Sequence, residues 1–357
     1  MRRCLALTLL MAVTLGLWGA LPMIAQTQRK VTQLAAGVYE IKHRDDLDGF
    51  ASGNTTVIIG DRQVFVVDTC FLPSAAREDI AQIRQWTDKP VTFVLNTHFH
   101  NDHNLGNRAY MDAFPAITII AHAETKKDMD MFGPGSASRE ERSIASLQHM
   151  LDTGKTSDGR ALTTEEKAEV KSALAHRMPV VEEIKAVRFQ SATLTFDRDF
   201  SIDLGNLVVQ VKFLGRGNTA GDAVAYLPKE KIVVAGDLVV YPVPYIYDGY
   251  PTEWIQTMQN LSQLDIDTIV PGHGPIMHDK TYLLLIRDLL KSAVEQMNAK
   301  LVQTGPAMFR SVDDVKGAVD LSSFQQRFAG NDQDRIAAFN DMTANLIKVV
   351  FEEASLR

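Results

Sequence analysis

Residues 97–103 concentrate the side chains of this sequence that most readily bind a metal ion. They read Thr-His-Phe-His-Asn-Asp-His and directly follow an apolar run. In a loop that leaves the end of a strand, His98 and His100 can point at one position, and Asp102 and His103 at a neighbouring one. Imidazole and carboxylate ligands suit Zn²⁺, and also Fe or Mn. The run therefore predicts a metal site.

The spacing of these residues resembles the HxHxDH motif of the metallo-β-lactamase superfamily. Three later features of that family follow in the expected order: a Gly-rich stretch at 215–222, a Gly-Asp pair that ends in Asp237, and Pro-Gly-His-Gly at 271–274. Asp68 also ends an early predicted strand, as in that family. The resemblance covers about residues 31–280.

The resemblance implies an α/β fold, a four-layer αββα sandwich with metals between its two sheets. By position in the motif, the first metal would be bound by His98 and His100, the second by Asp102, His103 and His273, and both by the bridging Asp237. Such a metal makes water a nucleophile near neutral pH and polarises the substrate. Asp102 is the expected catalytic residue, because it could orient the nucleophile and accept a proton.

Asn218 is the one departure from the family pattern. It stands where the Gly-rich stretch normally carries a third His for the first metal, and an amide oxygen is a weaker zinc ligand than imidazole. Two metals could still bind, with Asn218 coordinating weakly or through water. Alternatively, only the second site fills tightly, or the site has decayed. The expected cofactor is therefore one or two Zn²⁺, with Fe or Mn not excluded.

Four further residues are expected near the site. Asn54 and Asp68 are predicted to support the metal ligands. Tyr241 and Tyr245 belong to an aromatic loop after Asp237 and are predicted to line the substrate pocket. The alternative for these tyrosines is packing against the C-terminal helices.

The remaining histidines and the cysteines carry weaker signals. We expect His122 to be structural and His43 to be a surface or capping residue. Cys70 is interpreted as a small buried residue. The second cysteine, Cys4, falls in an N-terminal apolar segment, so we expect no internal disulfide.

Apolar patterns predict the elements that position these side chains. The segment 123–186 is predicted to be a helical insertion, and its second helix opens with a capping box at Thr163. Strands are expected at 38–41, 55–59, 64–67, 91–96, 117–121, 192–196, 200–203, 207–213, 223–227, 232–235 and 266–270. Helices are expected at 74–86, 136–151, 164–176, 254–264, 282–301 and 335–351.

Residues 1–25 are predicted to be a signal peptide, because two arginines precede an apolar run. This predicts a periplasmic or secreted protein with no stable membrane span after cleavage. The metallo-β-lactamase-like domain is expected at 26–280 and a C-terminal helical extension at 281–357. The net charge of -7 argues against nucleic-acid binding. The oligomeric state stays open.

The expected function is that of an exported metal-dependent hydrolase that acts on a small-molecule ester, lactone or lactam. One alternative is a mononuclear-metal oxidoreductase of the same fold, although Asn218 removes one of the ligands that such a site uses. The other is a metal- or ligand-binding protein with a degenerate first metal site. Retention of Asp102 and His103 argues against the latter.

Overall fold

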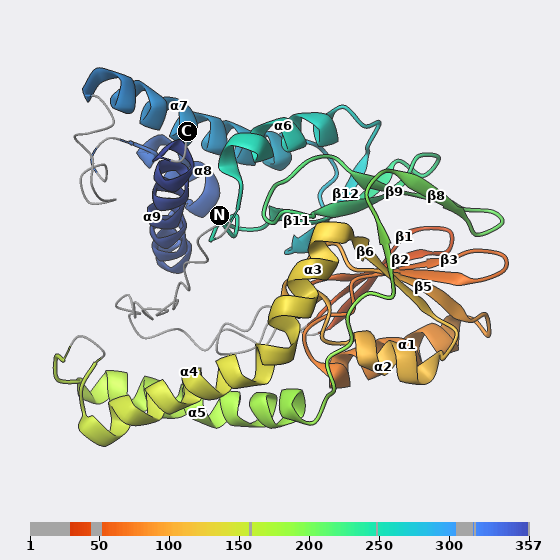
Figure 1. Ribbon diagram of the computed structural model, residues 1–357, viewed down its shortest axis with the longest axis horizontal. Coiled ribbons are helices and arrows are strands. Elements are labelled where there is room, and N and C mark those ends of the chain that lie inside the picture. Colours follow the sequence, from red (N-terminus) through yellow and green to blue (C-terminus); the bar gives the residue numbers. More distant parts are fainter. Residues whose placement is uncertain are drawn as a thin grey trace, which may run out of the picture.

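The computed structural model describes residues 29–43, 52–156, 159–247, 249–304, 317 and 319–355. The predicted signal peptide and Cys4 lie outside the described residues. Within them, two β-sheets stack face to face, and helices cover the outer face of each sheet (Figure 1). This is the predicted αββα sandwich.

Within the described residues, the first sheet has seven strands in the order β1-β2-β3-β4-β5-β6-β7, and the second has five in the order β12-β11-β10-β9-β8. The first sheet contains β1 (Lys30–Ala35), β2 (Val38–Lys42), β3 (Thr55–Ile59), β4 (Val64–Val67), β5 (Val91–Leu95), β6 (Thr118–His122) and β7 (Leu194–Phe196). The second contains β8 (Phe200–Asp203), β9 (Val208–Phe213), β10 (Ala223–Leu227), β11 (Ile232–Val240) and β12 (Thr268–His273).

The helices connect and cover these sheets. They are α1 (Pro73–Trp86), α2 (Asn107–Ala113), α3 (Ala123–Phe132), α4 (Ser136–Thr153), α5 (Thr164–Lys185), α6 (Pro251–Ser262), α7 (Thr281–Thr304), α8 (Ser322–Ala329) and α9 (Gln333–Ser355), with short 3₁₀ turns η1 (Asn101–His103) and η2 (Gly133–Gly135). No helix of the described chain is both long and apolar enough to cross a membrane.

Strand β4 shows why the buried strands are almost wholly apolar. Phe65 and Val67 point into the core between the two sheets. Val64 and Val66 point the other way, into the core between the first sheet and helices α1 and α2. Because a strand between two packed layers is buried on both faces, it reads as a continuous apolar run and not as an alternating one.

A third core lies on the outer face of the second sheet. It joins residues of β11 with residues of α6, α7 and α9, including Val233, Trp254, Leu289 and Leu346, all of them buried. Helices α6 and α7 run along this sheet in Figure 1. The C-terminal helices therefore form the outer α layer of the sandwich and share its core.

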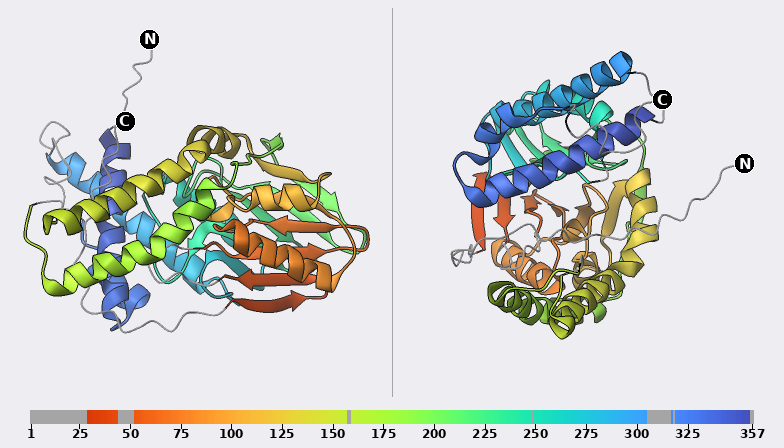
Figure 2. Two further views of the ribbon diagram at one scale, coloured as in Figure 1. Left: turned by 90° about the horizontal axis from the view of Figure 1, so that it is seen from below. Right: turned by 90° about the vertical axis from the view of Figure 1, so that its left-hand side faces the viewer.

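Helices α4 and α5 form an antiparallel hairpin that projects beyond the sheets (Figure 2). The predicted capping box at the start of α5 is present: the Thr163 side chain accepts from the Glu166 backbone, and the Glu166 side chain accepts from the Thr163 backbone. Helix α5 continues to Lys185, beyond the predicted end at 176. Ser74 lies inside α1, and its hydroxyl donates to Glu183.

Candidate metal centre

Parallel strands bring the metal-binding motif and its supports to one edge of the sandwich. Strands β4, β5 and β6 are mutually parallel, so their carboxyl ends meet at the same edge. Asp68 follows β4, the 97–103 run follows β5, and His122 ends β6. In the second sheet β11 and β12 are also parallel, and they carry Asp237 and His273.

Two glycines allow Asp237 to approach its neighbours. Strand β11 changes register around Gly236, which has φ 53°, a conformation that glycine adopts without strain. A Cβ at Gly236 would lie 2.6 Å from Oγ1 of Thr97, and one at Gly272 only 1.9 Å from Oδ1 of Asp237. Both positions therefore need glycine for the two sheets to meet at the carboxylate.

Asp102, His103 and His273 form one group of potential ligands. Nε2 of His273 lies 2.9 Å from Oδ2 of Asp102, and Nε2 of His103 lies 3.4 Å from the same oxygen. The two Nε2 atoms are 3.2 Å apart. The structure thus brings together the three residues expected to hold the second metal.

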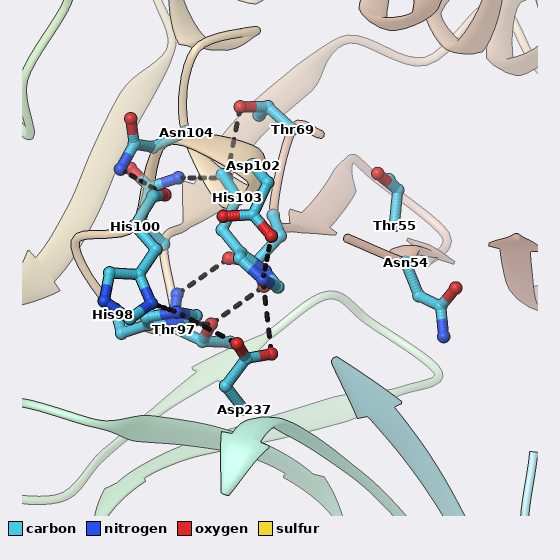
Figure 3. Close-up of polar contacts among 12 residues, drawn as sticks. Asn54, Thr55, Thr69, Thr97, His98, His100, Asp102, His103, Asn104 and Asp237 are labelled. Atoms are coloured by element: carbon cyan, nitrogen blue, oxygen red, sulfur yellow. Dashed lines mark hydrogen bonds and ion pairs between the residues drawn. The ribbon is translucent and has the colours of Figure 1, made fainter. Parts of the chain in front are cut away.

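His98, His103 and Asp237 form a second group, which shares His103 with the first. Oδ2 of Asp237 is 3.5 Å from Nε2 of His98, and Oδ1 is 3.2 Å from Nε2 of His103. Nδ1 of His100 is 3.0 Å from Nε2 of His98, which places His100 beside this group. Figure 3 shows these side chains converging on Asp237, whose two oxygens face different histidines as a bridging ligand would.

The arrangement fits divalent metal ions. Ligand nitrogens about 2.0–2.1 Å from a tetrahedral zinc stand roughly 3.3 Å apart, close to the 3.0 and 3.2 Å between the paired histidine nitrogens here. Oδ1 of Asp237 is buried and accepts no hydrogen bond from the described residues. A buried carboxylate oxygen in that state calls for a cation.

Comparison with known proteins decides the family. A sequence profile described as the metallo-β-lactamase superfamily matches residues 48–273, more than half of the chain. The chain belongs to the metallo-β-lactamase superfamily.

Individual relatives within the superfamily are distant. A linear primary-alkylsulfatase from Pseudomonas sp. (strain ATCC 19151) is 24% identical over 258 residues, covering 67% of this chain and 45% of the relative. A metallo-β-lactamase type 2 from Bacillus sp. (strain 170) is 33% identical over 97 residues, which is 26% of this chain and 37% of the relative. The chain thus spans less than half the length of these relatives.

Solved structures agree on the superfamily fold. A metallo-β-lactamase from Pontibacter korlensis superposes with a TM-score of 0.52 and 19% identity, covering 74% of this chain and 99% of that one. At this identity the likeness concerns the fold alone.

Burial and charge set the protonation of the metallo-β-lactamase motif. Burial alone would raise the pKa of Asp237, but His103, His273 and His98 outweigh it and hold that pKa well below its usual range. Burial would likewise raise the pKa of Asp102, but His103 and His273 outweigh it and lower that pKa strongly. Burial, helped by the charge of His98, lowers the pKa of His100 to about 3. The two carboxylates are therefore anionic, and His100 is a neutral imidazole.

Asp68 and Asn54 hold the motif from behind. Oδ1 of Asp68 accepts from the Thr97 backbone at 2.8 Å, and Oδ2 lies 2.8 Å from Nδ1 of His103. Nδ2 of Asn54 donates to the carbonyls of Pro271 and Gly274, at 3.0 Å each. These bonds fix the two chain segments that carry His103 and His273.

Asn218 is buried in the Gly-rich stretch between β9 and β10. It is 1% exposed, and neither atom of its amide has a hydrogen-bond partner in the described chain. Burial raises the pKa of Asp222, four residues later, to about 6. The charge of Asp237 adds to this rise, and His98 opposes it. A buried amide that makes no hydrogen bond to the described residues fits a ligand that coordinates a metal weakly or through water.

The two tyrosines differ in their surroundings. Tyr241 packs its ring 5.4 Å from that of Tyr282 in α7, and its hydroxyl accepts from Arg335 in α9 at 3.2 Å. Its ring contacts are thus those of the alternative, packing on the C-terminal helices. The Tyr245 ring centroid is 5.7 Å from that of His100, so this tyrosine borders the metal centre.

Sequence patterns missed Phe99 and Phe132, which join Tyr245 in an apolar rim beside the centre. The rings of Phe99 and Phe132 lie 5.6 Å apart, and Phe99 lies 4.6 Å from His100. The ring of Tyr247 lies 4.3 Å from that of Tyr245, which in turn lies 5.7 Å from the ring of His100. Phe132 ends α3 of the insertion, whose next helix places Oγ of Ser136 3.0 Å from Oδ1 of Asn101 in the motif. The sequence could have indicated this contact, because the insertion begins directly after β6, whose end lies at the same edge as the motif.

Of the two histidines expected to lie outside the site, one has the predicted role and the other does not. His122 caps α3 through Nδ1 and stacks on Phe213, a structural role. His43 is only 3% exposed and lies 3.2 Å from Oδ2 of Asp79, so its interpretation as a surface or capping residue was wrong. Its partner lies in α1, 36 positions away in the sequence, and no local pattern connects the two.

Proposed function

We propose that this protein is a metal-dependent hydrolase that cleaves a small-molecule ester, lactone or lactam whose apolar portion rests beside His100. The observation that carries the proposal is the position of Asp237, whose Oδ2 faces Nε2 of His98 and whose Oδ1 faces Nε2 of His103. One carboxylate thereby lies between two adjacent sets of potential ligands. A two-metal hydrolytic centre needs ligand sets that lie side by side in this way.

When bound, a divalent metal supplies Lewis acidity and an activated water. The chain's own residues do the rest. Asp102 is 22% exposed, whereas Asp237 is 3% exposed, so Asp102 is the carboxylate that substrate and solvent can reach. Its strongly lowered pKa keeps it ionised. We therefore infer that the ionised Asp102 orients the nucleophile by accepting a hydrogen bond from it.

The apolar rim supports a substrate with a hydrocarbon or aromatic portion. Three side chains of the rim are exposed to solvent: Phe132 (42%), Tyr245 (41%) and Tyr247 (45%). Exposed apolar side chains gathered beside a polar site commonly contact ligand. The similarity to a linear primary-alkylsulfatase also favours an amphiphilic ester, including a sulfate ester.

A substrate panel tests this function. Zinc-loaded protein is assayed with p-nitrophenyl esters of increasing acyl length, alkyl sulfates, lactones and a chromogenic β-lactam. We expect turnover of at least one ester class, with KM falling as the apolar chain lengthens, and loss of turnover in Asp102→Ala. No turnover of any member by fully loaded protein would reject the hydrolase.

Rim variants test the apolar contact separately. Phe132→Ala and Tyr245→Ala should raise KM for the long-chain substrate and leave that for the shortest one unchanged. Met178→Ala is the control, because Met178 is an apolar residue that is 55% exposed on α5 and is not one of the rim residues. Equal effects on short and long substrates would reject the rim as a substrate contact.

We also propose that the protein acts outside the cytoplasm, on the strength of the apolar segment that follows Arg2 and Arg3. Cell fractionation with N-terminal sequencing of the recovered chain tests this. Recovery of the intact N-terminus in the cytoplasmic fraction would reject export.

A further inference from the structure

A second cluster of potential metal ligands lies away from the centre described above. It consists of His43, directly after β2, Cys70, shortly after β4, and Asp79 in α1. An imidazole nitrogen, the thiol sulfur and a carboxylate oxygen lie within 4.8 Å of one another. All three side chains are buried, with exposures of 3%, 0% and 0%.

This cluster occupies a different layer from the candidate metal centre. Cys70 belongs to the apolar core between the first sheet and α1, together with Ala76, Ile80 and Ile83. Asp68, two residues earlier, sends its carboxylate to His103 and Thr97 instead. The chain between these two residues therefore serves two sites, and the sites share no ligand.

One polar atom of the cluster lacks a hydrogen bond within the described residues. Oδ1 of Asp79 accepts from Arg29 at 2.8 Å, but Oδ2 makes no hydrogen bond and faces Nε2 of His43 at 3.2 Å. Tyr110, in the same apolar core as Cys70, is completely buried, and its hydroxyl likewise makes no hydrogen bond to the described residues. A carboxylate oxygen, an imidazole nitrogen and a thiol sulfur that lie this close together out of reach of water are where a cation would sit.

The ligand types point to zinc. One sulfur, one imidazole nitrogen and one carboxylate oxygen are a borderline-soft set that Zn²⁺ binds tetrahedrally. The hydroxyl of Thr55, 3.1 Å from Nε2 of His43, or a water could complete the fourth position. Binding would form the sulfur–metal bond and release the thiol proton to solvent, so the thiolate and carboxylate balance the charge of the ion.

We propose that His43, Cys70 and Asp79 form a buried structural zinc site that fastens the end of β2 and the segment after β4 to α1. The site is independent of the proposed hydrolase activity. It has no open face for a substrate, because its three ligands are all buried.

Cobalt substitution tests the site directly. Cys70 and Cys4 are the two cysteines of the sequence, so full-length Cys4→Ser protein offers sulfur from Cys70 alone. Folded protein loaded with Co²⁺ should show a near-ultraviolet sulfur-to-cobalt charge-transfer band that saturates at one ion per chain. The same band should persist in Cys4→Ser with His98→Ala and His273→Ala, which weaken the other centre.

Two outcomes would overturn the proposal. One is a folded, cobalt-saturated Cys4→Ser protein without the band, which would leave the cluster as an ion-pair network around Arg29 and Asp79. The other is an equal zinc content in Cys4→Ser and in Cys4→Ser with Cys70→Ser. The first measurement needs no change at Cys70, so it decides the question even where Cys70→Ser fails to fold.

Discussion

Oδ2 of Asp68 lies 2.8 Å from Nδ1 of His103, and both side chains are buried. Because Nδ1 is engaged by the carboxylate, His103 presents Nε2 to Asp102, Asp237 and His273. Asp68 thus sets both the tautomer and the orientation of the one imidazole common to both ligand groups. A residue that binds no metal itself can therefore control the affinity of the whole centre.

Replacing Asp68 by Asn should weaken metal binding without unfolding the protein. Asp68 has φ 59°, a conformation that Asn also tolerates. Loss of the charged hydrogen bond should lower metal affinity by about 10–100-fold, measured by competition with a chelator. Asp112→Asn, at an exposed carboxylate on α2, is the matched control and should leave affinity unchanged. An unaltered affinity in Asp68→Asn would show that His103 keeps its orientation without the carboxylate.

Replacing Asn218 by His should strengthen binding of the more weakly held metal. The imidazole would supply the nitrogen ligand that the superfamily pattern places there, where the present buried amide makes no hydrogen bond to the described residues. Wild-type and variant protein are compared by zinc content after dialysis against a graded chelator series. The comparison cancels any zinc bound elsewhere. We expect the variant to retain about one more zinc at intermediate chelator strength, and coincident curves would rule out a role for position 218.

Replacing Leu289 by Ala should destabilise the entire fold. Leu289 is completely buried in the core that α7 shares with β11 and α9. Such a truncation costs about 2–5 kcal/mol of unfolding free energy, measured by denaturant titration. Val302→Ala, in the same helix but 85% exposed, should change stability by less than about 0.5 kcal/mol. Similar small effects for both variants would mean that the C-terminal helices are only loosely attached.

The N-terminus of α5 should lose its protection from hydrogen exchange in acid. Hydrogen bonds from Arg160 and Thr163 lower the pKa of Glu166 to about 2, from an ordinary value of 4.5. A carboxyl whose pKa is depressed in the folded state stabilises it above the ordinary value, and this contribution disappears as pH falls towards the folded value. The protection factor in the first turn of α5, which is the exchange rate of an unstructured peptide at the same pH divided by the observed rate, should therefore fall between about pH 4.5 and 2. Glu166→Gln should abolish that pH dependence, whereas Glu165→Gln should preserve it.

The sequence predicted most strands because burial on both faces makes them apolar runs, as in β4 and β10. It was less successful at element ends. Helix α5 runs through Pro179 to Lys185 although proline normally ends a helix. Strand β12 continues through Pro271 and Gly272, which are strong turn signals, because parallel pairing with β11 holds it extended.

The metal motif was visible in the sequence because its ligands are contiguous, whereas the surroundings of the centre depend on distant segments. No residue near Tyr241 in the sequence indicates that its hydroxyl will accept a hydrogen bond from Arg335. Likewise, no residue near His43 indicates that Asp79 will lie beside its imidazole. Such pairs arise only when helices and strands pack, so a single sequence provides no spacing from which to predict them.

The parallel pairing of β6 with β7 has a consequence for how this scaffold can change. A crossover between parallel neighbours needs only about a dozen residues, yet here residues 123–193 make the connection. Both ends of that long excursion are anchored in the sheet, and its near end reaches the motif through Phe132 and Ser136. Replacing residues 123–193 by a shorter or differently shaped crossover would change the surface beside the centre. It would remove none of the proposed metal ligands, because all of them lie outside this segment.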